Sequence, residues 1–142
     1  MKTWWILIPL IVIGSLTAQA PKPKVSSTSK YQTLPLKYYE ELKKCNGVDL
    51  VIFATGKSME FSEKNAQLPV TFIAKSSVKS IEGLRLLGLI MYKIDQKSFI
   101  DCDILANQDN SIVVLKLKTL DKKAYYNQIS PTGLETLKSW LK

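Results

Sequence analysis

The chain has no histidine and a single arginine among its 142 residues. Without histidine it offers no serine–histidine triad, no histidine-ligated zinc site and no imidazole for acid–base catalysis. Its two cysteines are too few to hold an all-thiolate zinc site or an iron–sulfur cluster unaided. Arginine is the residue that base-reading contacts favour, and here it occurs only as Arg85. The sequence therefore predicts no cofactor, no metal, no catalytic residue of a known kind and no nucleic-acid partner.

Glycine-rich phosphate loops are missing as well. The run 56–58, Gly-Lys-Ser, ends like a nucleotide-binding loop, but Val51 stands where that loop needs its first glycine. Asn107, Asp109 and Ser111 imitate the first ligand positions of a calcium loop, whose later glycine and glutamate are absent here. We interpret both segments as turns.

One long apolar run opens the chain. Residues 1–20 carry one charged residue, Lys2, then continue as an uncharged apolar stretch and end in the small-residue pattern Ala18-Gln19-Ala20. That plan is typical of a secretory signal peptide. A run of about 18 residues also reaches the lower end of a membrane-spanning helix. The sequence predicts export, with residues 1–20 either removed as a signal peptide or kept as an anchor, which would then be the chain's contact with a membrane.

A change of composition separates this run from the rest of the chain. Residues 21–34 are dominated by proline, serine and lysine, a composition that buries too little apolar surface to offset its ordering entropy. We predict a flexible linker there. Residues 35–142 have the length of one ordinary domain. The expected organisation is a leader, a linker and one globular domain.

Strand signals dominate that domain. Apolar and polar residues alternate in three segments separated by short polar turns, which predicts an antiparallel meander with one face open to water. Two further apolar runs predict buried strands. The three meander segments are residues 88–94, 99–106 and 113–118, and the two further strands are 48–55 and 70–75.

Helix signals lie near both ends of the domain. Residues 36–44 show a helical apolar face, and residues 132–141 carry a leucine stripe with Trp140. Thr132 and Glu135 have capping-box spacing at the start of the second helix, and the Ser-Pro pair before them offers a competing start. Residues 78–87 suit a helix or a strand. The predicted fold is α+β, with about five antiparallel strands and a helix near each end of the domain.

Asp101 and Asp103 are the candidate carboxylate pair. They stand two positions apart in a predicted strand, so both side chains point to one face. Such a pair has the chemistry to act as acid and base or to bind a cation. A solvated strand face also carries charges at this spacing.

Cys45 and Cys102 are predicted to form a disulfide. Export would place them in a compartment where such bonds persist, and the chain has no other cysteine. The bond would join the end of the first helix to the meander. The alternative is two buried thiols that pack as small apolar groups.

The basic composition and the leader point to a class of function. The formal net charge is +8 and the isoelectric point about 9.5, which favours acidic partners such as an anionic surface or an acidic protein. We predict an exported, extracytoplasmic (periplasmic or secreted) and non-enzymatic module, which binds a partner or serves as an accessory subunit of a cell-envelope assembly. The alternative is a small exported enzyme or ligand carrier using Asp101 and Asp103.

Overall fold

A computed structural model describes residues 31–142, which form one compact unit. The predicted leader (1–20) and most of the predicted linker (21–34) lie outside these residues. The last linker residues lie within them and pack on the domain. Leu34 is buried, and the Tyr31 ring lies edge-on to that of Tyr126, with the ring centroids 5.2 Å apart.

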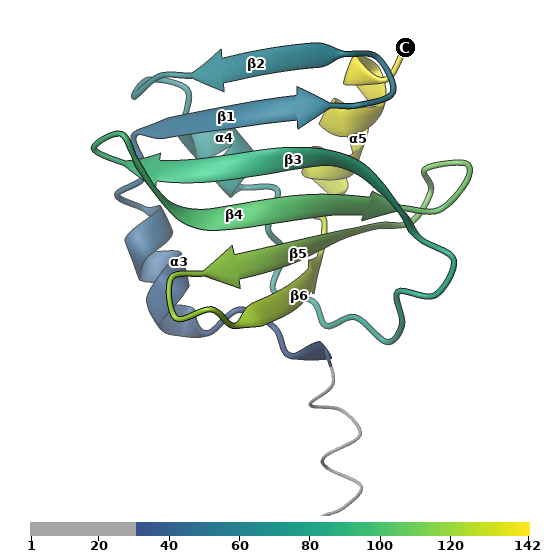
Figure 1. Ribbon diagram of the computed structural model, residues 1–142, viewed down its shortest axis with the longest axis horizontal. Helices are drawn as coiled ribbons and strands as arrows, with labels where there is room; N and C mark the ends of the chain where they lie inside the picture. The colour runs from purple at the N-terminus through teal and green to yellow at the C-terminus, as the bar shows by residue number, and fades with distance from the viewer. Residues whose placement is uncertain (1–30) are drawn as a thin grey trace, which may run out of the picture. The chain divides into compact units, whose positions relative to one another are not determined.

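One antiparallel sheet of six strands forms the body of the domain (Figure 1). Its strands lie in the spatial order β2-β1-β3-β4-β5-β6. Their bounds are β1 Gly47–Ile52, β2 Lys57–Phe61, β3 Arg85–Ile94, β4 Lys97–Ala106, β5 Val113–Thr119 and β6 Ala124–Gln128. The predicted meander is confirmed as β3, β4 and β5, and the structure extends it with β6.

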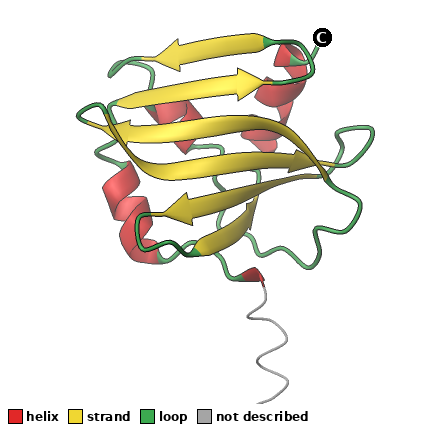
Figure 2. Ribbon diagram, in the orientation of Figure 1, coloured by secondary structure: helices red, strands yellow, loops and turns green. Residues whose placement is uncertain are grey.

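Among residues 31–142, the three α-helices lie behind one face of this sheet (Figure 2). They are α3 (Leu36–Leu42), α4 (Gln67–Val70) and α5 (Pro131–Trp140). The α+β class is therefore confirmed, with helices near both ends of the described domain. Helix α5 starts from the competing site: the Ser130 hydroxyl accepts a hydrogen bond from the Gly133 N–H (3.0 Å), and Pro131 fills the first helical position.

The core lies between the helices and the sheet. Leu42 of α3 and Leu137 of α5 are fully buried against the inward side chains of the strands, such as Leu50 and Ile90. Polar bonds also cross this interface: for example, the buried Tyr92 hydroxyl of β3 donates to the Pro69 carbonyl of α4 over 2.8 Å. No helix of residues 31–142 lies on the opposite face of the sheet (Figure 2).

The tight turn between β3 and β4 forms where the sequence predicts it. Asp95 and Gln96 both have positive φ angles, 53° and 71°, as the two central residues of a hairpin turn of matching twist require. Gly88 in β3 is required by a close approach of β1. A Cβ atom there would lie 2.3 Å from the Val51 carbonyl oxygen.

The predicted strand at residues 70–75 is wrong. Residues 67–70 form the single helical turn α4, and only Ile73 makes an isolated bridge, to Ile129. Phe72 and Ile73 are apolar because they are buried under the sheet. The apolar pattern thus correctly indicated that these residues are buried, but the backbone there is a helical turn followed by an extended stretch and not a strand.

Candidate functional site

The two candidate carboxylates lie on the open face of β4, as the alternation predicts. Asp101 is exposed and accepts a hydrogen bond of 2.6 Å from the Ser98 hydroxyl. Asp103 is ion-paired with Lys118 of β5 at 3.2 Å, and its side chain is 17% exposed. Each carboxylate thus has its own partner within the sheet.

Cation binding has no further support in the part of the chain that the structure describes. Among residues 31–142, no three histidine, cysteine, aspartate or glutamate side chains gather as a metal site would require. The calcium-like segment is a turn, as interpreted from the sequence. The Asp109 carboxylate accepts hydrogen bonds from the Ser111 hydroxyl (2.7 Å) and N–H (3.1 Å), which lower the pKa of Asp109.

Both cysteines are buried and free in the structure, so the predicted Cys45–Cys102 disulfide is not formed in it. Each thiol instead donates to a nearby backbone carbonyl, Cys45 to Gly47 (3.3 Å) and Cys102 to Asp103 (3.7 Å). Burial raises the pKa of the Cys102 thiol well above its usual value, and the charge of Asp103 adds to that effect. A thiol held in its neutral form is a poor nucleophile.

The open face of the sheet combines apolar and charged side chains. Val51, Leu89 and Met91 lie half-buried on adjacent strands β1 and β3, at registers that put them on the same face as Asp49 and Asp103. Half-buried apolar side chains on a helix-free face leave contact area that another molecule can cover.

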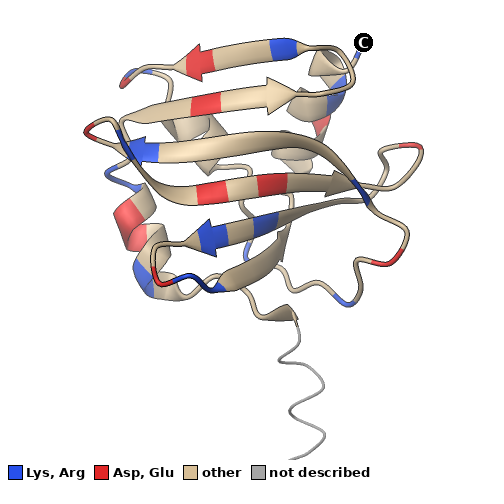
Figure 3. Cartoon of the chain, viewed as in Figure 1, with Lys and Arg blue, Asp and Glu red and all other residues tan. Residues whose placement is uncertain are grey.

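Charges of both signs surround this apolar centre (Figure 3). Acidic side chains lie on β2, β1 and β4, and lysines lie on β3 and β5. Lys93 is ion-paired with Asp49, and the side chains of the two residues are 28% and 27% exposed. An apolar centre within a charged border is the anatomy of a protein–protein interface. We name this helix-free side of the sheet, centred on Val51, Leu89 and Met91, the open face.

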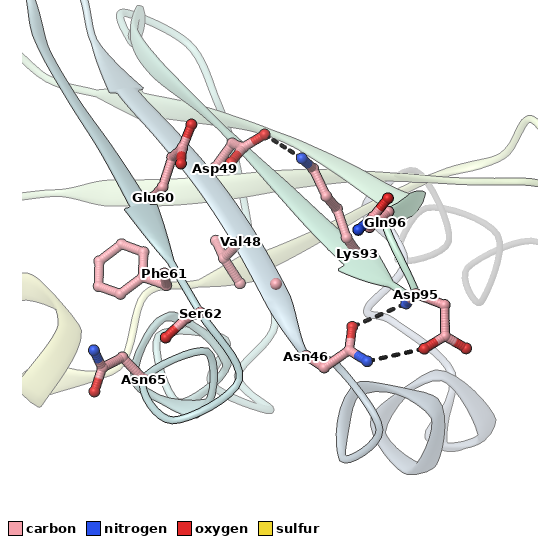
Figure 4. Close-up of a pocket in the computed structure, with 11 residues that line it drawn as sticks. Asn46, Val48, Asp49, Glu60, Phe61, Ser62, Asn65, Lys93, Asp95 and Gln96 are labelled. Atoms are coloured by element: carbon pink, nitrogen blue, oxygen red, sulfur yellow. Dashed lines mark hydrogen bonds and ion pairs between the residues drawn. The ribbon is translucent and has the colours of Figure 1, made fainter.

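A hollow of about 580 Å³ lies at the end of the sheet where β1 begins and β2 ends, and Val48 and Phe61 from the helix side also line it (Figure 4). Asn46 and Asp95 close one side of it: the Asn46 amide donates to the Asp95 carboxylate (3.0 Å) and its oxygen accepts from the Asp95 N–H (2.9 Å). Asp49, Glu60 and Lys93 also line it. The hollow is mostly polar and open, suited to a polar side chain of a partner.

Sequence reasoning missed this hollow. Asn46 and Asp95 lie in short polar stretches between predicted elements, and no pattern in the sequence marks them as neighbours. The pairing of Gly47 with Lys93 places Asn46, just before β1, beside Asp95, just after β3. Locating the site requires the pairing of β1 with β3. Those strands are separated in the sequence by β2, α4 and a long connection, so no local pattern predicts that pairing.

Comparisons with known proteins return no relative. No protein-family model, no curated protein sequence and no solved structure matches this chain. Among residues 31–142, no helix is long and apolar enough to cross a membrane.

Proposed function

We propose that this chain is an exported, non-enzymatic module that binds a protein partner of the cell envelope through the open face of its sheet. The observation that carries the proposal is the contrast between the two faces. Three helices pack on one face, whereas Val51, Leu89 and Met91 stay half-buried on the other. The composition of residues 1–20 supports export.

The charged border would set the orientation of the partner. Acidic side chains on β1 and β4 alternate across the open face with lysines on β3 and β5, and Asp49 is ion-paired with Lys93 and Asp103 with Lys118. Complementary charges on a partner steer association and exclude wrong partners more than they add affinity. The apolar centre supplies the contact area. A partner of this module therefore carries apolar side chains flanked by charges of both signs.

The alternative function is a small exported enzyme or ligand carrier that uses Asp101 and Asp103. Such a site would need both carboxylates to reach one ligand. Asp101 is engaged by Ser98 and Asp103 by Lys118, which supports a structural role for both on a solvated strand face. The binding module agrees better with this geometry.

Exchange of one central side chain tests the proposal. Leu89→Lys replaces apolar contact area with a positive charge. Leu89 lies opposite Asp103 of β4, so the new ammonium is placed beside a carboxylate and the fold tolerates it. We expect the tagged full chain, purified from its own cells, to lose its co-purifying envelope protein roughly tenfold or more, as for a central interface residue.

Ser139→Lys is the matched control, because Ser139 is exposed on α5, behind the sheet. It should retain the partner in full, and both variants should melt close to the wild type. Equal recovery of the partner with Leu89→Lys and with the wild type would refute the open face as the binding surface. Intact mass and cell fractionation of the same material test export separately.

A further inference from the structure

The two edge strands of the sheet, β6 and β2, differ in how their outward backbone groups are bonded. At the β6 edge, the Tyr126 N–H donates to the Gln32 carbonyl over 2.7 Å. Gln128 is bonded on the same side through both of its backbone groups, donating to Ser76 (3.1 Å) and accepting from Ala74 (3.2 Å). The β6 edge is therefore capped by segments of the chain itself. At the other edge, β1 is the one strand neighbour that β2 has within residues 31–142 (Figure 1).

The pairing of β1 shows which backbone groups of β2 point outward. The Phe53 N–H donates to the Leu87 carbonyl (3.0 Å), so the opposed residues Ile52 and Gly88 form a non-hydrogen-bonded pair. Because the pattern alternates, Ile52 directs its own backbone groups to β2. In the pairing of β1 with β2, Ile52 is opposite Lys57, so Lys57, Met59 and Phe61 bond to β1, and the outward backbone groups belong to Ser58 and Glu60.

We propose that the β2 edge pairs with β2 of a second copy of this chain. The two strands run antiparallel about a two-fold axis at Met59. Ser58 of each copy then faces Glu60 of the other, and these are the residues whose N–H and C=O groups point outward. Two such pairs make about four backbone hydrogen bonds and join the two sheets into one.

Side chains on the helix side favour this register. Met59 meets Met59 of the second copy in the close, non-hydrogen-bonded position, where side chains approach best. Lys57 comes opposite Phe61 of the second copy, which sets an ammonium beside an aromatic ring. The Phe61 ring packs on the Trp140 ring of α5, with ring centroids 6.1 Å apart.

Charges on the open side exclude the neighbouring register. In the Met59-centred pairing, the Ser58 hydroxyl can donate to the Glu60 carboxylate across the axis. Moving the axis to Glu60 would put two carboxylates directly opposite each other, which is destabilising. Moving it to Ser58 would pair part of the strand with the turn at Gly56. The charge pattern of β2 thus fits a second copy in one register.

Disulfide cross-linking between cysteines introduced into β2 tests the register of the proposed dimer directly. In the full chain, we expect Met59→Cys to form a disulfide-linked dimer under mild oxidation, because the axis brings the two Cβ atoms close. Ser58→Cys and Glu60→Cys alone should not link, whereas the double variant should. The buried native cysteines are common to all variants. Equal linking at Ser139→Cys, or none at Met59→Cys, would overturn the proposal.

Proline substitution tests the backbone bonds. Ser58→Pro removes an N–H that points away from β1, so the monomer loses no strand bond. The dimer loses two bonds, and we expect its dissociation constant to rise roughly thirty-fold, about 2 kcal/mol. Sedimentation of the full chain, with wild type and variant in the same detergent, measures this. A wild type that stays monomeric would contradict the proposed dimer, and so would a folded Ser58→Pro variant that dimerises as well as the wild type. If the variant does not fold, the disulfide experiment decides.

Discussion

Replacing Asn127 with alanine should destabilise the domain far more than its position in a short edge strand suggests. Asn127 is fully buried in β6. Its side-chain oxygen accepts from the Leu34 N–H (2.9 Å), and its amide donates to the Ala74 carbonyl (2.6 Å) and the Tyr39 hydroxyl (2.5 Å). One side chain thus joins the N-terminal segment, helix α3 and the extended stretch after α4 to the sheet.

The loss of unfolding free energy depends on which buried polar groups Asn127→Ala leaves without a hydrogen-bond partner. The Ala74 carbonyl keeps a second donor, because the Tyr39 hydroxyl also donates to it (3.3 Å). The buried Leu34 N–H loses this acceptor, which costs about 1–3 kcal/mol. With the lost bonds and the small cavity, we expect about 2–4 kcal/mol in total. That is a large share of the roughly 5–15 kcal/mol that holds a domain folded.

Thermal unfolding followed by far-UV circular dichroism measures the effect. The midpoint of Asn127→Ala should fall by roughly 10–20 °C. Gln128→Ala is the matched control, because the adjacent Gln128 is exposed and its side-chain amide donates to the Ser77 carbonyl near the surface (2.7 Å). We expect little change there. Equal midpoints for Asn127→Ala and the wild type would refute the view that this amide holds the domain together.

Three further predictions follow from buried or hydrogen-bonded groups. Leu137→Ala together with Trp140→Ala should leave the domain largely unfolded at 37 °C, since a large-to-small core change costs about 2–5 kcal/mol; an unchanged melting curve would show that α5 is peripheral. Cys45 and Cys102 should react with a thiol reagent slowly in folded protein and fully after denaturation, because both are buried and free; fewer than two thiols in denatured protein would show a disulfide. Hydrogen bonds lower the pKa of Asp121, so its stabilising effect is present above about pH 4 and is lost as the pH falls further; Asp121→Asn should flatten this acid limb in a pH series of unfolding midpoints.

The meander could be predicted because its signals are local. Alternation in β3, β4 and β5 decides which side chains face the core, and the tight turn at Asp95 and Gln96 fixes the first hairpin. The open-face position of Asp101 and Asp103 followed from the same alternation. None of these needed knowledge of a distant segment.

The two edge strands were missed because their patterns depend on partners far along the chain. In β6, a fully buried Asn127 stands where alternation expects an apolar residue, and its burial rests on partners in other segments. In β2, Lys57, Ser58 and Glu60 are exposed, so the strand resembles a polar loop. The length of the apolar run from Val70 likewise suggested a strand where tertiary packing selects a turn.

The open face is the centre of this account, and site-specific photocross-linking at Met91 tests it most directly. A photoreactive residue at Met91 in the full chain, in its own cells, should give one discrete adduct of higher mass with an envelope protein. The same residue at Ser139 on α5 should not give that adduct. An adduct absent at Met91, or the same adduct at both positions, would contradict the claim that the helix-free face of the sheet binds the partner.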